Sequence, residues 1–122
     1  MAKRHGRHTP AFLLLQLADG PAYGQMLVKK MEDNLPFCFS DSAIIYRSLK
    51  DMEENGLVET NWETKASGKP VKWYSITQKG LEMLDYFADD IQKCHANLAY
   101  FLSSYPTANH QSEKIIKGPS NE

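Results

Sequence analysis

Residues 45–58, with the sequence IYRSLKDMEENGLV, decide the fold of this chain. Three apolar residues in it are spaced by four and three positions, which places them on one face of a helix: Ile45, Leu49 and Met52. Asn55-Gly56 then forms a strong stop signal, because glycine tolerates the left-handed conformation that ends many helices. From Leu57 onward the apolar residues alternate, as they do in a strand. The stretch therefore predicts a helix that passes directly into a β-strand.

A second strand follows after a polar loop. Leu57–Glu63 and Val71–Ile76 both alternate and are rich in β-branched and aromatic residues. Between them lies the turn-forming segment 65–70, Lys-Ala-Ser-Gly-Lys-Pro. The pattern predicts a β-hairpin.

Three helices are predicted before this hairpin. The first covers Thr9–Ala18, with Thr9 as its cap and Pro10 in the first helical position, where its missing N–H group costs nothing. The second covers Ala22–Asn34, whose apolar residues recur at helical spacing. The third covers Ser40–Asn55, with Ser40 or Asp41 as its cap.

A long last helix is predicted from Gln78 to about Tyr105, with Thr77 as its cap and Pro106 as its end. Apolar residues in it alternate spacings of three and four over three heptads: Leu84, Phe87, Ile91, Cys94, Leu98, Phe101 and Tyr105. No other segment offers a heptad face of equal length, which favours pairing with a second copy of the chain. We expect these seven residues, called the seam below, to form the interface of a homodimer.

The order of elements predicts the fold class: a mainly α protein with a small β-hairpin, built as a winged helix-turn-helix with a long C-terminal dimerisation helix. Four regions follow from it: a basic flexible arm (1–8), a winged-helix DNA-binding domain (9–76), the dimerisation helix (77–105) and a disordered polar tail (106–122).

Composition limits the class of protein. The 122 residues suit one domain, and two cysteines are too few for a disulfide framework. No apolar run approaches the ~20 residues of a membrane span and no leader peptide is apparent, so we expect a cytoplasmic protein. The net charge of −1 argues against a binder that relies on charge alone, so a DNA-binding interpretation depends on where the charges lie.

The basic residues lie where a winged helix touches DNA. Its third helix enters the major groove, and its hairpin loop meets phosphates or the minor groove. The candidate DNA-binding residues are Lys3, Arg4 and Arg7 in the arm, Ser42, Tyr46, Arg47 and Lys50 on the third helix, and Lys65, Ser67, Lys69 and Lys72 on the hairpin.

An alternative remains open at this point. Arg47 and Lys50 have acidic neighbours, Asp51 and Glu54, on the same helix, with which they can form ion pairs. The arm is equally well explained as a solvated tail. The protein would then be a winged-helix module that binds another protein and has no specific affinity for DNA.

Three segments, in order and correctly spaced, resemble the PadR family of transcription regulators. They are GPAYG at 20–24, the quoted stretch at 45–58, and GKPVKWYSIT at 68–77 followed by Gly80. The resemblance runs from about Phe12 to Leu84, and the single long helix beyond it is typical of the smaller PadR-like subgroup.

The resemblance implies properties that the spacing does not. It implies a homodimer that exchanges the last helix against the partner's N-terminal helix, and a repressor that a small hydrophobic or aromatic effector releases from DNA. Independently of the resemblance, a twofold dimer would bind double-stranded DNA at an inverted-repeat operator. Departures from the family pattern at Gln25, Ser42, Ala43 and Ile44 suggest an unusual operator sequence.

The sequence gives little support to other functional classes. There is no nucleophile motif, phosphate-binding loop or pair of carboxylates in an apolar setting, so we expect no enzyme. Cys94 and His95 are adjacent on a helix, where their side chains point about 100° apart, so we expect neither a metal site nor a cofactor. Four aromatic or aliphatic residues are candidates for a hydrophobic ligand site, with packing in the core as the alternative. They are Trp73, Phe87, Ile91 and Phe101.

Overall fold

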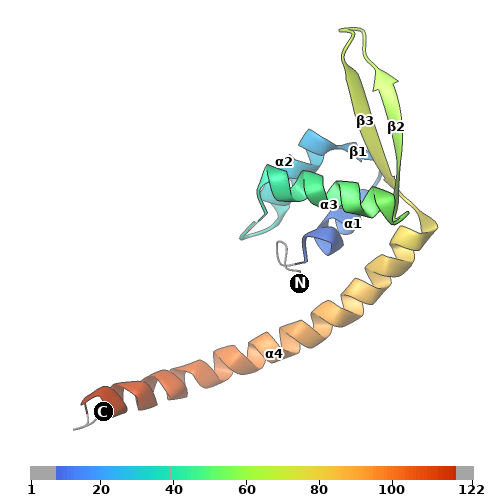
Figure 1. Ribbon diagram of the computed structural model, residues 1–122. Coiled ribbons are helices and arrows are strands. Elements are labelled where there is room, and N and C mark those ends of the chain that lie inside the picture. The colour runs from blue at the N-terminus through green and yellow to red at the C-terminus, as the bar shows by residue number, and fades with distance from the viewer. Residues whose placement is uncertain (1–7, 39, 118–122) are drawn as a thin grey trace. The chain divides into compact units, whose positions relative to one another are not determined.

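The computed structural model describes residues 8–38 and 40–117 (Figure 1). The elements follow in the order α1 (Thr9–Ala18), β1 (Ala22–Tyr23), α2 (Gly24–Asn34), α3 (Ser42–Glu54), β2 (Val58–Thr64), β3 (Pro70–Ile76) and α4 (Gln78–Lys117). This is a winged-helix fold with a long C-terminal helix, which confirms the predicted fold class.

The chain divides into two compact units, residues 1–87 and 88–122. The first holds α1 to α3, the sheet and the first turns of α4, and the second holds the rest of α4. Within the described residues, no helix is both long and apolar enough to cross a membrane.

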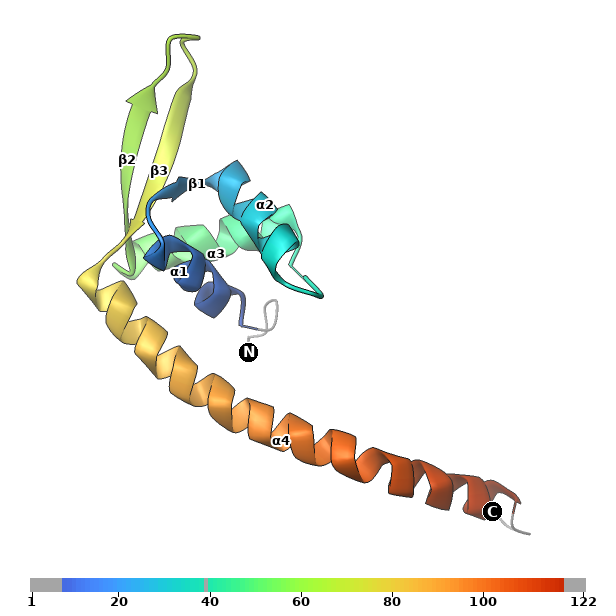
Figure 2. The same cartoon turned by 180° about the vertical axis from the view of Figure 1, so that it is seen from behind.

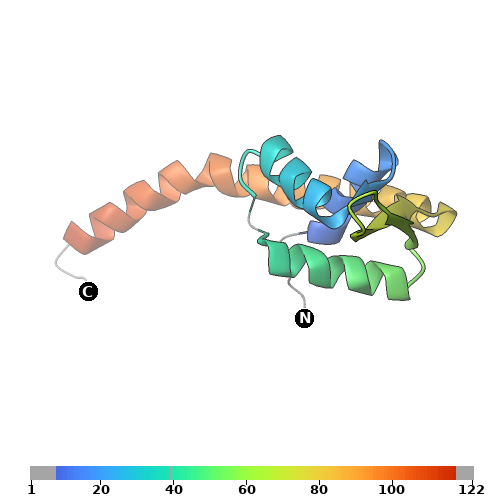
Figure 3. The same ribbon diagram turned by 90° about the horizontal axis from the view of Figure 1, so that it is seen from above.

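The core of the first unit lies between the three short helices and the sheet. The view from behind in Figure 2 shows α1, which packs on both α2 and α3. Ile45, Leu49 and Met52 are buried there, which confirms the stripe predicted for α3. Figure 3 looks along the hairpin and shows the three helices gathered at its base.

The start of α1 differs from the prediction. Thr9 does not cap the helix, because it lies within the first turn and is fully buried, where its hydroxyl forms a hydrogen bond with Ser40. His8 occupies the capping position in a left-handed conformation (φ 72°), without a side-chain capping hydrogen bond. Pro10 is the second residue of the helix and not the first as predicted, but it still lies in the first turn, where a missing N–H group leaves no intrahelical bond unmade.

The predicted hairpin is part of a three-stranded antiparallel sheet in the order β1-β3-β2. The second helix begins at Gly24, two residues later than predicted, because Ala22 and Tyr23 form β1 and pair with Tyr74 and Trp73. A strand of two residues is too short to produce a recognisable alternation, and only its pairing with β3 defines it.

The third helix is two residues shorter at its start and one at its end than predicted. Asp41 is the cap, and its carboxylate accepts a hydrogen bond from the Ile44 N–H at 2.9 Å. Gly56 has a φ of 77°, and the Leu57 N–H donates back to the Met52 carbonyl oxygen at 2.9 Å. The predicted stop at Asn55-Gly56 is therefore confirmed as a left-handed C-cap.

The last helix begins as predicted and ends later. The Thr77 hydroxyl accepts a hydrogen bond from the Gly80 N–H at 3.0 Å, as a capping residue does. The helix continues through Pro106 to Lys117, whereas an end at Tyr105 and a disordered tail were expected. Proline removes one N–H group and crowds the carbonyl one turn earlier, which kinks a helix without necessarily ending it.

Candidate nucleic-acid interface

The side of α3 opposite its core stripe carries exposed basic residues. Arg47 and Lys50 are both exposed, as is Ser42 in the first turn. Within the described part of the chain, neither Arg47 nor Lys50 forms an ion pair, so the ion pairs with Asp51 and Glu54 that the sequence allowed are not formed. Both cations are available to an external anion.

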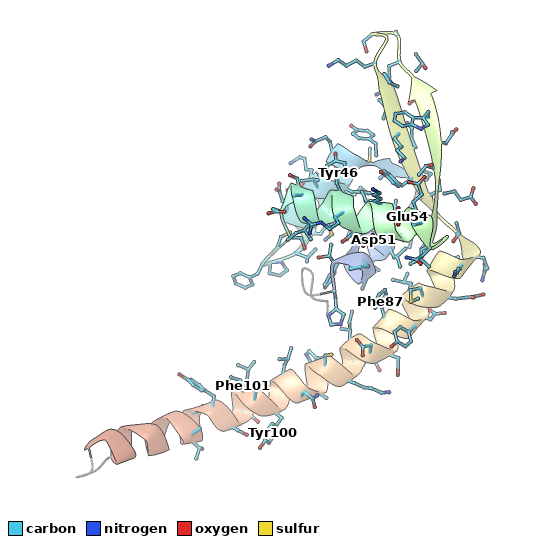
Figure 4. All side chains as sticks on the ribbon, in the orientation of Figure 1. Tyr46, Asp51, Glu54, Phe87, Tyr100 and Phe101 are labelled. Carbon is cyan, nitrogen blue, oxygen red and sulfur yellow. The ribbon has the colours of Figure 1, made fainter. Side chains whose placement is uncertain are left out.

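Charge is divided along this exposed side. Arg47 lies near the middle of α3, while the acidic residues Asp51 and Glu54 follow in its last turns (Figure 4). A recognition helix contacts base edges with its N-terminal residues. The charge distribution therefore suits an approach in which α3 faces DNA from its first turn as far as Lys50, with the acidic last turn directed away.

Tyr46 lies beside this surface and is 40% exposed. Its ring rests against Gly24, at the first position of α2: a Cβ added to Gly24 would lie 2.7 Å from the ring carbon Cζ. Glycine at this position therefore makes room for the ring. The contact orients a side chain whose hydroxyl is a candidate hydrogen-bond donor to a phosphate.

The tip of the hairpin, residues 65–69, is called the wing tip below. It projects away from the helices (Figure 1), and Lys65, Ser67 and Lys69 are all exposed on it. The turn is closed by a hydrogen bond of 2.8 Å from the Gly68 N–H to the Lys65 carbonyl oxygen, and Gly68 has a φ of 89°. The wing tip thus presents cations and a hydroxyl, the groups that phosphate contacts need.

Lys72 is placed differently from the other candidates. It is half-buried, and its ammonium nitrogen lies 3.0 Å from the Glu53 carboxylate on α3. The second oxygen of that carboxylate accepts a hydrogen bond from the Thr60 hydroxyl at 3.1 Å. The hydrogen bond with Lys72 lowers the pKa of Glu53, and the same bond raises the pKa of Lys72. The charge of Lys72 is already balanced within the protein.

Three predicted residues lie outside the described structure, and one exposed residue of the hairpin was not predicted. Lys3, Arg4 and Arg7 lie outside the described residues. Trp62, on β2, is 61% exposed and was not predicted as a surface residue of interest. In the structure Trp62 pairs directly with Lys72 across the sheet, and this register is not contained in the alternation of either strand alone.

The predicted dimer seam divides between the two units. Leu84 and Phe87 are half-buried against the core of the first unit. In the second unit, Ile91 and Cys94 are half-buried, while three seam residues are more than half exposed: Leu98 (62%), Phe101 (59%) and Tyr105 (51%). Tyr100 and Leu102 are also exposed there (Figure 4 labels Tyr100 and Phe101), so the later half of α4 carries a large apolar surface.

The candidate ligand residues lie in different parts of the structure. Trp73 packs edge-on against Tyr23 and lines a shallow groove with Trp62. Phe87 lines a separate recess of about 170 Å³ with Met52 and Met83. Ile91 and Phe101 belong to the second unit.

A family model described as "Transcriptional regulator PadR-like family" matches residues 13–86, more than half of the chain. The chain belongs to this family of transcriptional regulators. PadR-like proteins regulate transcription by binding DNA, commonly as dimers, and are not enzymes. The match confirms the resemblance found in the sequence.

Solved structures support this assignment. A putative transcriptional regulator from Thermoplasma acidophilum has a TM-score of 0.70 and 25% identity, over 78% of this chain and 90% of that one. A PadR-like regulator from Bacillus cereus has a TM-score of 0.64 and 27% identity, over 76% and 89%. A PadR family regulator from Eggerthella lenta has a TM-score of 0.61 and 27% identity, over 75% and 81%. Among curated proteins, none matches this chain.

Proposed function

We propose that this PadR-like protein is a repressor that binds an inverted-repeat operator as a homodimer. The observation that carries the proposal is the pair Arg47 and Lys50, exposed and without an ion pair in the described structure, on the side of α3 away from the core. Basic side chains that reach a base edge in the major groove read guanine through O6 and N7.

The proposal assigns two kinds of contact. Arg47 and Lys50 read base edges, with Ser42 and Tyr46 placed to reach the flanking phosphates. The wing tip grips the backbone through Lys65, Ser67 and Lys69, and the arm adds Lys3, Arg4 and Arg7. We leave Lys72 out of the gripping group because Glu53 already binds its ammonium group.

The second copy pairs through α4. Leu98, Phe101 and Tyr105 are exposed in the single chain, and burying such a surface is favourable at roughly 25 cal/mol per Å² of apolar area. A twofold dimer places its two recognition helices about 34 Å apart on one face of DNA, so the operator has half-sites about one helical turn apart.

The proposal also includes the place where the protein acts and the way in which repression is relieved. The protein acts in the cytoplasm with the DNA, and a small hydrophobic or aromatic effector relieves repression. Exposed aromatic residues on α4, Tyr100 and Phe101 among them, give such a molecule a surface of suitable chemistry at the interface between copies.

The test is a binding titration on DNA from the protein's own promoter region and on scrambled DNA of equal length, at several salt concentrations. A preference for the promoter DNA of roughly 10³-fold or more at physiological salt supports specific recognition. Equal affinity for both DNAs at every salt concentration contradicts it and favours the protein-interaction module.

A further inference from the structure

Glu53 connects three elements of the winged helix through one carboxylate. One oxygen binds the ammonium group of Lys72 on β3 at 3.0 Å, and the other accepts a hydrogen bond from the hydroxyl of Thr60 on β2 at 3.1 Å. The side chains of Lys72 and Glu53 are 31% and 36% exposed, so water screens the pair only partly. The last full turn of α3 is therefore joined to both strands of the hairpin.

The hydrogen bonds of Glu53 lie between the base of the hairpin and its exposed tip, so they can restrain the outer part of the hairpin. At the base, the Thr77 N–H donates to the Leu57 carbonyl oxygen at 3.1 Å, and Tyr74 is buried in the core. Towards the tip, every residue from 61 to 70 is exposed. In the described part of the chain, the hydrogen bonds of Glu53 are the outermost ones between the hairpin and α3.

The ammonium group of Lys72 is also held on its other sides. It lies 5.8 Å from the centroid of the Trp62 ring and 5.5 Å from that of Tyr74, distances at which a cation is attracted to an aromatic face. A lysine with these three neighbours loses much of the freedom that a phosphate-gripping lysine on a surface retains.

We propose that Glu53 and Lys72 are positioning residues that set the angle between the wing and the recognition helix α3. This inference rests on the proposed function, in which α3 reads bases and the wing tip grips phosphates. If the angle is fixed in advance, both contacts form in one register and the wing adds to specific binding. If the hairpin swings about its base, the wing tip still finds phosphates, but no longer in the register that the correct base sequence requires.

Glu54 provides a matched control. It is the next residue on the same helix, it is exposed, and in the described structure it has no ion pair. Glu53→Gln and Glu54→Gln remove the same charge from neighbouring positions. Their comparison separates the loss of the connection from the general gain that any DNA-binding surface obtains when it loses a negative charge.

The first measurement needs no DNA. The full-length protein has two tryptophans, so its NMR spectrum contains two indole N–H signals. Glu53→Gln is expected to shift the Trp62 signal, because Lys72 leaves the ring, and to raise amide hydrogen exchange at residues 60–72. The Trp73 indole N–H donates to Glu63 at 2.8 Å and is expected to change little. Glu54→Gln is expected to leave both signals and the exchange rates unchanged.

The second measurement is the ratio of affinities for operator and scrambled DNA. Glu53→Gln is expected to lower this ratio roughly threefold to tenfold, the effect of losing a partly exposed charged hydrogen bond, while Glu54→Gln preserves it. A general loss of stability would lower the folded fraction and weaken binding to both DNAs by the same factor, so it would leave this ratio unchanged.

Three results would overturn the inference. Identical behaviour of Glu53→Gln and Glu54→Gln in both measurements means that the connection has no effect on the wing. Equal tightening of operator and scrambled DNA by Glu53→Gln alone means that Lys72 is a phosphate-gripping residue that Glu53 restrains. Weaker binding of Glu53→Gln to operator and scrambled DNA by the same factor assigns the effect to stability. If the wild type prefers no DNA, the proposed function fails, and the NMR measurement alone decides whether Glu53 holds the wing.

Discussion

The ring of Tyr46 on α3 lies against Gly24, the first residue of α2. Two ring carbons and the hydroxyl oxygen of Tyr46 occupy the space that a Cβ at Gly24 would need. Since Gly24 is buried and Tyr46 is 40% exposed, the contact joins the core to the surface that we assign to DNA binding. A methyl group at this position could be accommodated only if the outer end of the Tyr46 ring moved.

Gly24→Ala is expected to destabilise the protein. Alanine is favoured over glycine in helices by about 1 kcal/mol, so without the tyrosine this change would stabilise α2. An added methyl group would push the outer end of the Tyr46 ring aside, and overpacking typically costs about 1–3 kcal/mol of unfolding free energy. Because the ring is partly exposed and can move, we expect a net loss at the low end of that range. Urea denaturation measures it. The same change in a Tyr46→Ala background should cost less or become favourable, and an equal cost in both backgrounds would show that the ring is not the cause.

Arg47→Ala and Lys69→Ala are expected to weaken DNA binding in different ways. Loss of a base-reading residue should cost about 1–3 kcal/mol on the operator and little on scrambled DNA. Loss of a phosphate-gripping lysine should weaken both alike and reduce the slope of log affinity against log salt by about one unit. Titrations at four or more salt concentrations distinguish these patterns. If the two variants behave alike on both DNAs, the assignment of reading to α3 and gripping to the wing tip is wrong.

Leu98→Asp is expected to abolish the dimer. Sedimentation of the wild type at micromolar concentration should give a mass about twice 13.9 kDa. A carboxylate at position 98 would have to be buried in an apolar interface, which is strongly unfavourable. Asn97→Asp is the control, because it adds the same charge to the neighbouring exposed position outside the seam. A monomeric wild type, or equal loss of the dimer in both variants, would contradict the assignment of the seam as the dimer interface.

The contribution of the Glu53–Lys72 pair to stability should depend on pH in a defined way. The lowered pKa of Glu53 means that its contribution is present above the ordinary glutamate pKa of 4.5 and is lost as the pH falls through the lower folded value. The raised pKa of Lys72 means that its contribution is present below 10.5 and is lost as the pH rises through the higher folded value. The difference in unfolding free energy between wild type and Glu53→Gln should therefore be level from about pH 5 to 10 and shrink outside that range. A difference that varies steadily across neutral pH would assign it to other groups.

Sequence periodicity predicted the elements whose contacts are local. The stripe of Ile45, Leu49 and Met52, the stop at Gly56 and the cap at Thr77 all follow from residues within a few positions of one another. These features depend on helix geometry alone, and the structure contains each of them.

The differences arise where a distant partner decides the outcome. Thr9 has the chemistry of a cap, but Ser40, 31 positions away, takes its hydroxyl. Lys72 has the chemistry of a phosphate-binding residue, but Glu53, 19 positions earlier on α3, binds its ammonium group. Neither partner can be identified from spacing, because the fold alone brings these residues together.

One hydroxyl group joins the end of α3 to the start of α4. The Thr77 hydroxyl donates to the Gly56 carbonyl oxygen at 2.7 Å and accepts from the Gly80 N–H at 3.0 Å. Valine has nearly the same shape but can make neither bond, so it would leave a carbonyl and an amide without their partners. The backbone bond from the Thr77 N–H to the Leu57 carbonyl oxygen would remain, so we expect such a variant to keep both helices. The corner at which the two helices meet would be looser, because it would then depend on backbone contacts alone.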